Sequence, residues 1–348
     1  MTITIHTGCC LSVLRDLPAE SVHTCVTSPP YWGLRDYGTA GQLGLEPTPE
    51  EYVANMVEVF REVRRVLRAD GTLWVNLGDS YAHDAKKGRA SASQSGKHGY
   101  LNGRNQARAD LSQCSLKPKD LVGIPWMVAF ALRADGWYLR SDIIWNKSNP
   151  MPESVTDRPT KSHEYVFLLS RSDRYFYDAE AIREPAEHSS IKRWMQNVEA
   201  QEGSHRANAG AKTNGTMKAV GGPRRGDKQR GHSRRHDGFN QRWDGMSKAE
   251  QAEMGRNKRT VWTVATKPFS EAHFATYPPE LIEPCILAGS PPGGTVLDPF
   301  FGAGTTGLVA DRLQRNCIGI ELNPQYVEIA ERRLRRDAGM LADIVVPV

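Results

Sequence analysis

Two short motifs in this chain of 348 residues combine residue types that can carry out chemistry. The first, T-S-P-P-Y-W at positions 27–32, directly follows an apolar run that is typical of a buried strand. The Ser28 hydroxyl and the Pro29 carbonyl can accept the two hydrogens of an exocyclic amine. These contacts would free a lone pair that is otherwise conjugated into a heterocyclic ring, so that the nitrogen can attack the methyl group of a sulfonium.

The other residues of this motif have supporting roles in the same chemistry. Pro30, like Pro29, stiffens the turn and has no N–H that could compete as a donor. Tyr31 offers a face on which a base rotated out of a duplex can stack, and Trp32 would widen that surface. Taken alone, the motif also fits a proline-bent strand exit covered by an aromatic lid.

The second motif, D-P-F-F-G-A-G-T-T at positions 298–306, follows a short apolar strand and opens a helix. Gly302 and Gly304 allow the backbone to turn tightly and to approach a ligand closely. The next expected strand ends about 20 positions later at Glu321, whose carboxylate can accept hydrogen bonds from a ribose diol. This pair of features predicts a binding site for an adenosine-type cofactor.

A dinucleotide site is an alternative, because Gly307 completes the literal spacing G-x-G-x-x-G. Hydride transfer, however, would leave the Ser-Pro-Pro-Tyr motif without a role. The sequence contains no G-x-x-x-x-G-K-[ST] motif, so a phosphate-binding P-loop is not supported.

Alternating strands and helices must position these motifs. Apolar runs rich in β-branched residues alternate with segments of helical period, which predicts an α/β fold with a doubly wound, mostly parallel sheet. The expected strands are Ile3–Thr7, Val22–Ser28, Thr72–Leu77, Leu139–Trp145, Glu164–Leu169, Thr295–Asp298 and Cys317–Glu321. The expected helices are Pro49–Arg68, which Thr48 caps, and Asp120–Ala134, Pro279–Ala288, Thr305–Gln314 and Pro324–Arg335.

The net charge of +5 is distributed unevenly along the chain. Residues 81–119 carry a net charge of +6 and residues 183–260 one of +8, which leaves −9 for the rest. Both stretches interrupt the alternation of strands and helices, so we expect basic insertions that follow a phosphate backbone. Basic loops that are only solvated or disordered are the alternative. The arginines expected to contact the substrate are Arg224, Arg225, Arg234 and Arg235.

The two motifs resemble those of a known family, the amino-methyltransferases of DNA. T-S-P-P-Y-W is similar to their catalytic motif and D-P-F-F-G-A-G-T-T to their cofactor motif. The catalytic motif comes first along the chain, which resembles the circularly permuted order called the beta class. The resemblance covers residues 3–80, 120–180 and 260–335, and it implies a Rossmann-like fold that uses S-adenosylmethionine to methylate double-stranded DNA.

The resemblance also implies roles for single residues. Ser28, Pro29 and Tyr31 would hold the target amine, and Glu321 would bind the ribose. The other residues expected at the cofactor are Asp298, Phe300, Gly302, Gly304 and Thr305, with Phe269, His273 and Phe274 as weaker candidates. For His273 a hydrogen-bonded structural histidine is the alternative. Residues 1–184 would form the catalytic part with the insertion 81–119, residues 185–258 the target-recognition region and residues 259–348 the cofactor-binding part.

Serine at the first position of the catalytic motif resembles the enzymes that act on the N4 amine of cytosine. The N6 amine of adenine stays open, since some members with serine methylate adenine. Carbon-5 methylation through the Pro284-Cys285 dipeptide is not expected, because Cys285 lies in an apolar-periodic segment that is typical of burial. A non-catalytic DNA-binding protein and a methyltransferase of protein amides are the remaining alternatives.

No run approaches the roughly 18 apolar residues of a membrane span, and the N-terminus has no basic region followed by an apolar one. We therefore expect a cytoplasmic enzyme without a membrane partner. The six cysteines include no C-x-x-C pair, which favours reduced thiols and no metal site. Whether the chain forms a homodimer, and whether a restriction endonuclease is paired with it, stays open.

Overall fold

The computed structural model describes residues 1–82, 115–187, 191, 245–247, 250, 253–267, 276–338 and 343–347. Within these residues one nine-stranded sheet forms, with the strand order β6-β4-β5-β3-β2-β7-β8-β1-β9. The strands are β1 (Thr2–Thr7), β2 (Val22–Thr27), β3 (Leu67–Leu77), β4 (Tyr138–Asn146), β5 (His163–Ser170), β6 (Val261–Thr263), β7 (Thr295–Asp298), β8 (Asn316–Glu321) and β9 (Asp343–Val345). The helices are α1 (Cys10–Asp16), α2 (Pro49–Val66), α3 (Ile124–Ala134), α7 (Pro279–Gly289), α8 (Thr305–Arg312) and α9 (Pro324–Ala338).

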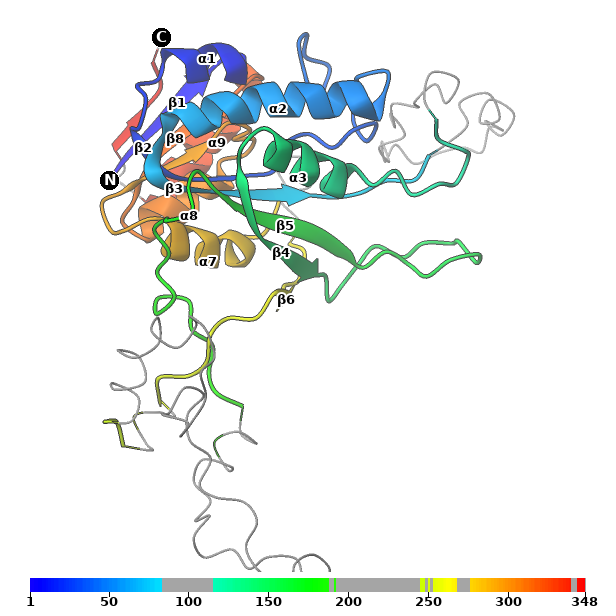
Figure 1. Ribbon diagram of the computed structural model, residues 1–348. Coiled ribbons are helices and arrows are strands. Elements are labelled where there is room, and N and C mark those ends of the chain that lie inside the picture. Colours follow the sequence, from blue (N-terminus) through cyan, green and yellow to red (C-terminus); the bar gives the residue numbers. More distant parts are fainter. Residues whose placement is uncertain are drawn as a thin grey trace, which may run out of the picture. The chain divides into compact units, whose positions relative to one another are not determined.

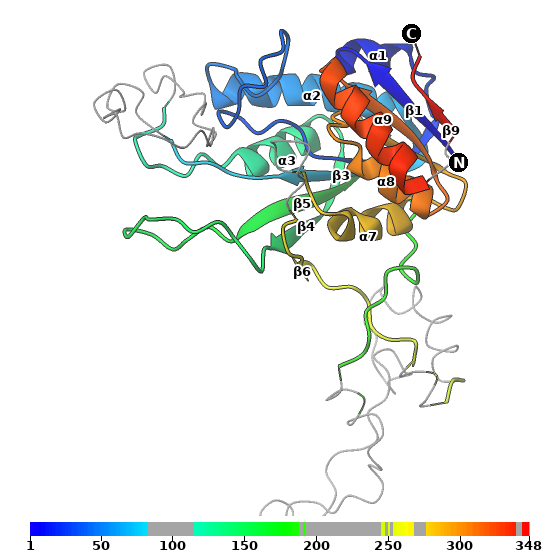
Figure 2. The same cartoon turned by 180° about the vertical axis from the view of Figure 1, so that it is seen from behind.

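Helices cover both faces of this sheet. Helices α2 and α3 lie along one face, with α1 beside α2, and α7 and α8 lie along the other face (Figure 1). Helix α9 packs beside α8 (Figure 2). Because both faces are covered, every residue from Gly71 to Leu77 of β3 is buried. This arrangement confirms the predicted doubly wound α/β fold. None of the helices described is long and apolar enough to cross a membrane.

Strand direction is mixed at one side of the sheet. Strands β3, β2, β7, β8 and β1 run parallel to their neighbours in that central series. Strand β5 runs antiparallel to both β3 and β4. The beginning of β5 therefore lies at the edge of the sheet where the parallel strands end.

All seven predicted strands and all five predicted helices are present, with differences at their ends. The start of α3 was predicted too early, at Asp120, whereas the helix begins at Ile124. The Asp79 carboxylate determines this start by accepting the backbone N–H groups of Gly123 at 2.9 Å and of Ile124 at 3.2 Å. The elements α1, β6 and β9 were not predicted.

Helix α2 holds the first motif in place. Its cap is the predicted one, since the Thr48 side chain accepts a hydrogen bond from the Glu51 N–H at 3.2 Å. Tyr52, Met56 and Phe60 on its inner face are completely buried. The Tyr52 hydroxyl also donates to the Pro30 carbonyl at 2.9 Å, which ties the turn after β2 to the helix.

The chain divides into two compact units. One comprises Met1–Ala181 together with Arg259–Val348, and the other comprises Ile182–Lys258. Within the second unit, Glu184 and Arg256 form an antiparallel bridge with backbone hydrogen bonds of 2.9 and 2.8 Å. The predicted insertion 185–258 falls in this unit, and its role in target recognition stays a prediction. Most of the predicted insertion 81–119 lies outside the described residues.

Candidate active site

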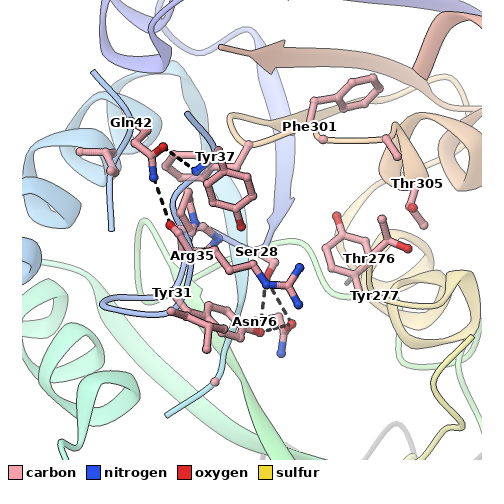
Figure 3. A pocket seen from close by; sticks show the side chains of 18 of the residues that line it. Ser28, Tyr31, Arg35, Tyr37, Gln42, Asn76, Thr276, Tyr277, Phe301 and Thr305 are labelled. Atoms are coloured by element: carbon pink, nitrogen blue, oxygen red, sulfur yellow. Dashed lines mark hydrogen bonds between the residues drawn. The ribbon is translucent and has the colours of Figure 1, made fainter. Parts of the chain in front are cut away.

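A cavity of about 1030 Å³ opens at the edge of the sheet where β2, β3, β7 and β8 end. The turn after β2 and the glycine loop after β7 both line it, although they are far apart in sequence. Strands β2 and β7 are parallel neighbours, with Cys25 paired with Leu297, so their ends must meet at the same edge. Figure 3 shows Ser28 and Tyr31 from the first turn facing the same space as Phe301 and Thr305.

The buried Asp298 joins the two turns. Its Oδ1 accepts the Thr27 hydroxyl at 2.6 Å and the Phe300 N–H at 3.1 Å. Its Oδ2 accepts the Thr306 hydroxyl at 2.6 Å and the Tyr277 hydroxyl at 3.0 Å. Burial raises the pKa of Asp298, and these four donors oppose that shift. Asp298 therefore holds the end of β7 against the end of β2, and it does not line the cavity.

The glycine loop has a left-handed backbone at Gly302 and Gly304, where φ is +51° and +76°. Gly304 precedes the first residue of α8 and lies against Ala330, away from the cavity lining. Gly302 lines the cavity, and an added Cβ there would meet no atom within 4 Å. The backbone of the loop is therefore open to a ligand at Gly302.

The third glycine of the literal G-x-G-x-x-G spacing has a packing role. A Cβ at Gly307 would approach the Phe301 Cζ atom to 2.7 Å, and one at Gly319 would also collide with this ring. Phe301 is thus buried against two glycines and fixes the loop between β8 and α8. The dinucleotide alternative gains no support from Gly307.

Glu321 ends β8 and faces the cavity. Its Oε2 accepts the Gly302 N–H at 2.8 Å, and its Oε1 accepts the Asn323 N–H at 2.9 Å. Burial raises the pKa of Glu321, although these two backbone donors favour the ionised form. Each oxygen keeps a lone pair with which it can accept a hydroxyl, so the geometry suits the recognition of a ribose diol.

The turn after β2 presents acceptors to the cavity. Ser28 Oγ donates to Asn76 Oδ1 at 3.3 Å, which leaves lone pairs on Ser28 for an incoming N–H. No described residue donates to the Pro29 carbonyl. The Tyr31 ring lies against Gly78, where a Cβ would approach Tyr31 Cε2 to 2.5 Å, and Tyr31 also lines the cavity.

A polar network behind this turn was not foreseen from the sequence. The Tyr31 hydroxyl donates to Glu164 Oε2 at 2.7 Å and contacts Asn76 Oδ1 at 3.0 Å. Lys147 pairs with the other oxygen of Glu164. Burial and the nearby Glu164 carboxylate raise the pKa of Tyr31 well above its usual value, so the phenol remains a donor. The network fixes both the ring of Tyr31 and the amide of Asn76.

Sequence patterns alone gave little sign of this network. Glu164 was predicted only as the first residue of a strand, and Lys147 was assigned no role. The one available signal was a charged residue at the start of an otherwise apolar strand. Its meaning depends on the reversed direction of β5, which brings the start of that strand to the site.

A loop between β2 and α2 provides a further wall that was also not predicted. Gln42 holds this loop by donating to the Arg35 carbonyl at 3.1 Å and by accepting the Tyr37 N–H at 2.7 Å. Arg35 and Tyr37 line the cavity. Figure 3 shows Arg35 extending into the space that Thr276 and Tyr277 border from the other side.

The structure places the expected site residues in three groups. The cavity is lined by Ser28, Pro29, Pro30, Tyr31, Phe300, Gly302, Thr305 and Glu321. Asp298, Gly304 and Trp32 lie behind its wall. Outside the described residues are Phe269, His273, Phe274, Arg224, Arg225, Arg234 and Arg235.

Trp32 corrects one expectation. Its ring is only 3% exposed and belongs to the hydrophobic core, and its indole N–H donates to the Glu46 carbonyl at 2.9 Å. Trp32 therefore does not extend the stacking surface of Tyr31. An aromatic residue after a proline turn can point either way, and here the apolar surface under α2 was the more favourable place for the indole.

Cys285, the only candidate for a cysteine nucleophile, lies inside α7. It is 1% exposed and does not line the cavity. Its position is that of a small buried hydrophobic residue, so the structure gives no support to a covalent cysteine mechanism.

Comparisons with known proteins agree with this geometry. A family model described as a DNA methylase matches residues 22–332, a range that contains both motifs. The chain is 46% identical over 339 residues to the type II methyltransferase M.Cfr9I of Citrobacter freundii, covering 95% of this chain and 87% of that protein. It is 41% identical over 332 residues to the type II methyltransferase M.SmaI of Serratia marcescens, covering 95% of this chain and 90% of that protein.

Solved structures share the fold. TTHA0409 from Thermus thermophilus, described as a putative DNA modification methylase and complexed with S-adenosyl-L-methionine, matches with a TM-score of 0.55 and 21% identity, over 99% of this chain and 100% of that chain. PvuII DNA methyltransferase (cytosine-N4-specific) matches with a TM-score of 0.56 and 18% identity, over 95% of this chain and 87% of that chain. At such identities the likeness concerns the fold alone.

Proposed function

Because this chain belongs to the DNA methylase family of N6 and N4 amino-methyltransferases, we propose that it methylates the N4 amine of cytosine in double-stranded DNA. The broader activity, methylation of DNA with S-adenosylmethionine as the cofactor, follows from membership of the family. The observation that carries the finer proposal is the convergence of the Ser28–Tyr31 turn and the glycine loop on one cavity.

The residues at the glycine loop fit an adenosine-type sulfonium. Gly302 leaves open space where any other residue would place a side chain, and the Glu321 carboxylate faces the same space. Phe300 and Thr305 line the cavity on either side of this loop. When bound, S-adenosylmethionine supplies an electrophilic methyl group. In the proposal these residues hold the cofactor at the end of the cavity opposite Tyr31.

Ser28 and Pro29 prepare the nucleophile. One hydrogen of the target amine bonds to Ser28 Oγ and the other to the Pro29 carbonyl, which draws the nitrogen out of conjugation and directs its lone pair at the methyl group. Asn76 keeps the Ser28 hydroxyl hydrogen turned away from the amine, because it accepts that hydrogen at 3.3 Å. The methylated nitrogen then releases one proton through these acceptors.

Tyr31 positions the base. Its hydroxyl is tied to Glu164 and one side of its ring is covered by Gly78, so the ring has little freedom to rotate. Within a duplex the target amine cannot reach the cavity floor, and the base must rotate out of the stack. A ring that is fixed in advance offers a stacking surface without an additional entropic cost.

The choice of cytosine depends on Ser28. A neutral hydroxyl accepts a hydrogen bond more weakly than a carboxylate or an amide does, and serine at this position resembles the enzymes that act on cytosine N4. The experiment is to incubate unmethylated DNA with enzyme and S-adenosylmethionine, digest the DNA to nucleosides and weigh the products. N4-methylcytosine is expected. N6-methyladenine without N4-methylcytosine would overturn the base assignment.

The contacts with DNA outside the cavity are part of the same proposal. The insertion 185–258 would read the target sequence, and Arg224, Arg225, Arg234 and Arg235 would contact the phosphate backbone. A restriction endonuclease paired with this enzyme and a homodimer stay predictions. Sequencing of the methylated DNA, with detection of the modified base, would give the recognition site that such an endonuclease shares.

A further inference from the structure

The loop that joins β4 to β5, residues 147–162, extends beyond the ends of both strands (Figure 1). Its first half lines the rim of the cavity, from Asn149 to Glu153. Because β4 and β5 are adjacent and antiparallel, the loop begins and ends beside the target-binding turn. Any duplex that delivers a base to Ser28 must therefore approach this loop.

Several contacts brace this loop. The Asn149 amide donates to the Thr266 carbonyl at 3.1 Å and accepts the Thr266 N–H at 2.8 Å. The Glu153 carboxylate accepts Arg158 Nη1 at 2.7 Å and the Lys161 N–H at 3.2 Å. The Arg158 guanidinium also lies 3.8 Å from the centre of the Tyr81 ring. The loop therefore presents its side chains in a defined position before any ligand binds.

One large apolar side chain projects from this braced loop. Met151 is 87% exposed, the highest exposure of any large hydrophobic residue described. It lies between Pro150 and Pro152, whose rings restrict the backbone on both sides. Methionine is unbranched and flexible, and exposed apolar side chains of this kind can enter a base stack as wedges.

We propose that Met151 enters the DNA duplex and occupies the space that the target base leaves when it rotates into the cavity. The inference rests on the proposed extrusion of the base. Extrusion leaves two neighbouring base pairs without a stacking partner, and burial of the methionine side chain between them removes apolar surface from water. The hydrogen bonds at Asn149 and Glu153 hold the wedge at the rim, next to the opening through which the base passes.

The test compares two duplexes that carry the mapped methylation site. One is intact, and in the other the target nucleotide is abasic, so that nothing has to be extruded. Binding is measured by fluorescence anisotropy in the presence of S-adenosylhomocysteine, which prevents turnover. The wild-type enzyme is expected to bind the abasic duplex more tightly, since no pair is broken. Equal affinity for the two duplexes would contradict extrusion, and with it the proposed function.

Met151→Ala is expected to weaken binding to both duplexes by about tenfold, because the gap in the stack is present in both. Met151→Leu, which keeps an apolar side chain of similar size, is expected to bind nearly as well as the wild type. Val155→Ala is the matched control, since Val155 is exposed on the same loop and does not line the cavity. It is expected to leave both affinities unchanged.

Two results would overturn the assignment of Met151. A loss on the intact duplex alone would mean that Met151 contacts the extruded base inside the cavity. No loss on either duplex would mean that it does not enter the DNA. An unchanged affinity of Met151→Ala for S-adenosylmethionine, measured by calorimetry, is expected in every case and excludes a folding defect.

Discussion

At the scale of single residues, the site depends on acceptors held in fixed directions. Ser28 Oγ is oriented by Asn76, and Asn76 is itself held through a hydrogen bond from its Nδ2 to the Tyr165 carbonyl at 3.0 Å. Neither of these partners carries a charge. The proposed mechanism therefore relies on geometry to make the amine nucleophilic, and the removal of a single hydroxyl should have a large effect.

Ser28→Ala is expected to retain affinity for S-adenosylmethionine and to lose most turnover. The loss should be roughly a hundred- to a thousandfold, the range found when one preorganised polar contact to a transition state is deleted. Single-turnover methylation of DNA and calorimetric titration of the cofactor measure the two effects. Ser21→Ala, which removes a surface hydroxyl before β2, is the control. Unchanged turnover in Ser28→Ala would remove Ser28 from the mechanism.

Glu321 predicts a pH dependence of cofactor binding. Acceptance of two ribose hydroxyls requires the ionised carboxylate, and burial raises the pKa of Glu321. A proton therefore competes with the cofactor as the pH falls, and the loss of affinity should begin closer to neutrality than for an ordinary glutamate. Calorimetric titrations at several pH values between about 5 and 8 would measure this. Glu321→Gln should bind more weakly at the alkaline end of this range and show a flatter profile, and a profile as steep as that of the wild type would exclude Glu321 as its cause.

At the scale of elements, one aromatic ring determines the path of the glycine loop. Phe301 fills the space that side chains at Gly307 and Gly319 would otherwise occupy. Strand β8, helix α8 and the loop therefore share one packing contact. This explains why the glycines of the region have different physical roles, even though their spacing looks like a single motif.

Two glycine substitutions should separate these roles. Gly319→Ala places a methyl group against the Phe301 ring and is expected to destabilise the fold by about 1–3 kcal/mol, the usual cost of overpacking a core. Gly302→Ala places a methyl group in open space at the cavity and should weaken cofactor binding more than it lowers the Tm, although its φ of +51° adds some strain. Thermal unfolding and calorimetry on both variants would test this. Equal effects of the two on cofactor affinity would contradict the assignment.

The same scale shows what the sequence could predict. Apolar periodicity identified the long strands and helices, because burial on both faces of a parallel sheet leaves continuous apolar runs. The short elements carry too few residues for such a pattern, and the N-cap residue of α1, Cys9, makes no capping hydrogen bond with its side chain. The direction of β5 is absent from any local pattern, and for that reason the roles of Glu164 and Lys147 were missed.

At the scale of the whole molecule, the charge of the chain is divided by function. The residues outside the two basic stretches have a net charge of −9, whereas those stretches together carry +14. An acidic body by itself would repel a phosphate backbone. The basic stretches should therefore account for most of the dependence of DNA binding on salt.

Replacement of four arginines by serine should test this division. The variant changes Arg224, Arg225, Arg234 and Arg235. If each arginine neutralises one phosphate, the slope of log K against log salt should become shallower by about 3 to 4, since each contact contributes about 0.9. Titrations of duplex DNA at a series of salt concentrations give this slope, and the affinity for S-adenosylmethionine should not change.

A control variant with the same change of charge removes surface arginines of the first unit, each of which pairs with a carboxylate. These are Arg61, Arg68, Arg312 and Arg335. Its salt slope should stay close to that of the wild type. If both variants change the slope equally, the insertion has no special role in contacting the phosphates.

The antiparallel bridge between Glu184 and Arg256 marks where the chain enters and leaves the second unit. A segment attached in this way resembles a cassette, because it can be exchanged without disturbing the strands that carry Ser28 and Glu321. Under selection from changing invasive DNA, such an enzyme could acquire new sequence preferences by recombination within this segment alone, while its chemistry is inherited intact.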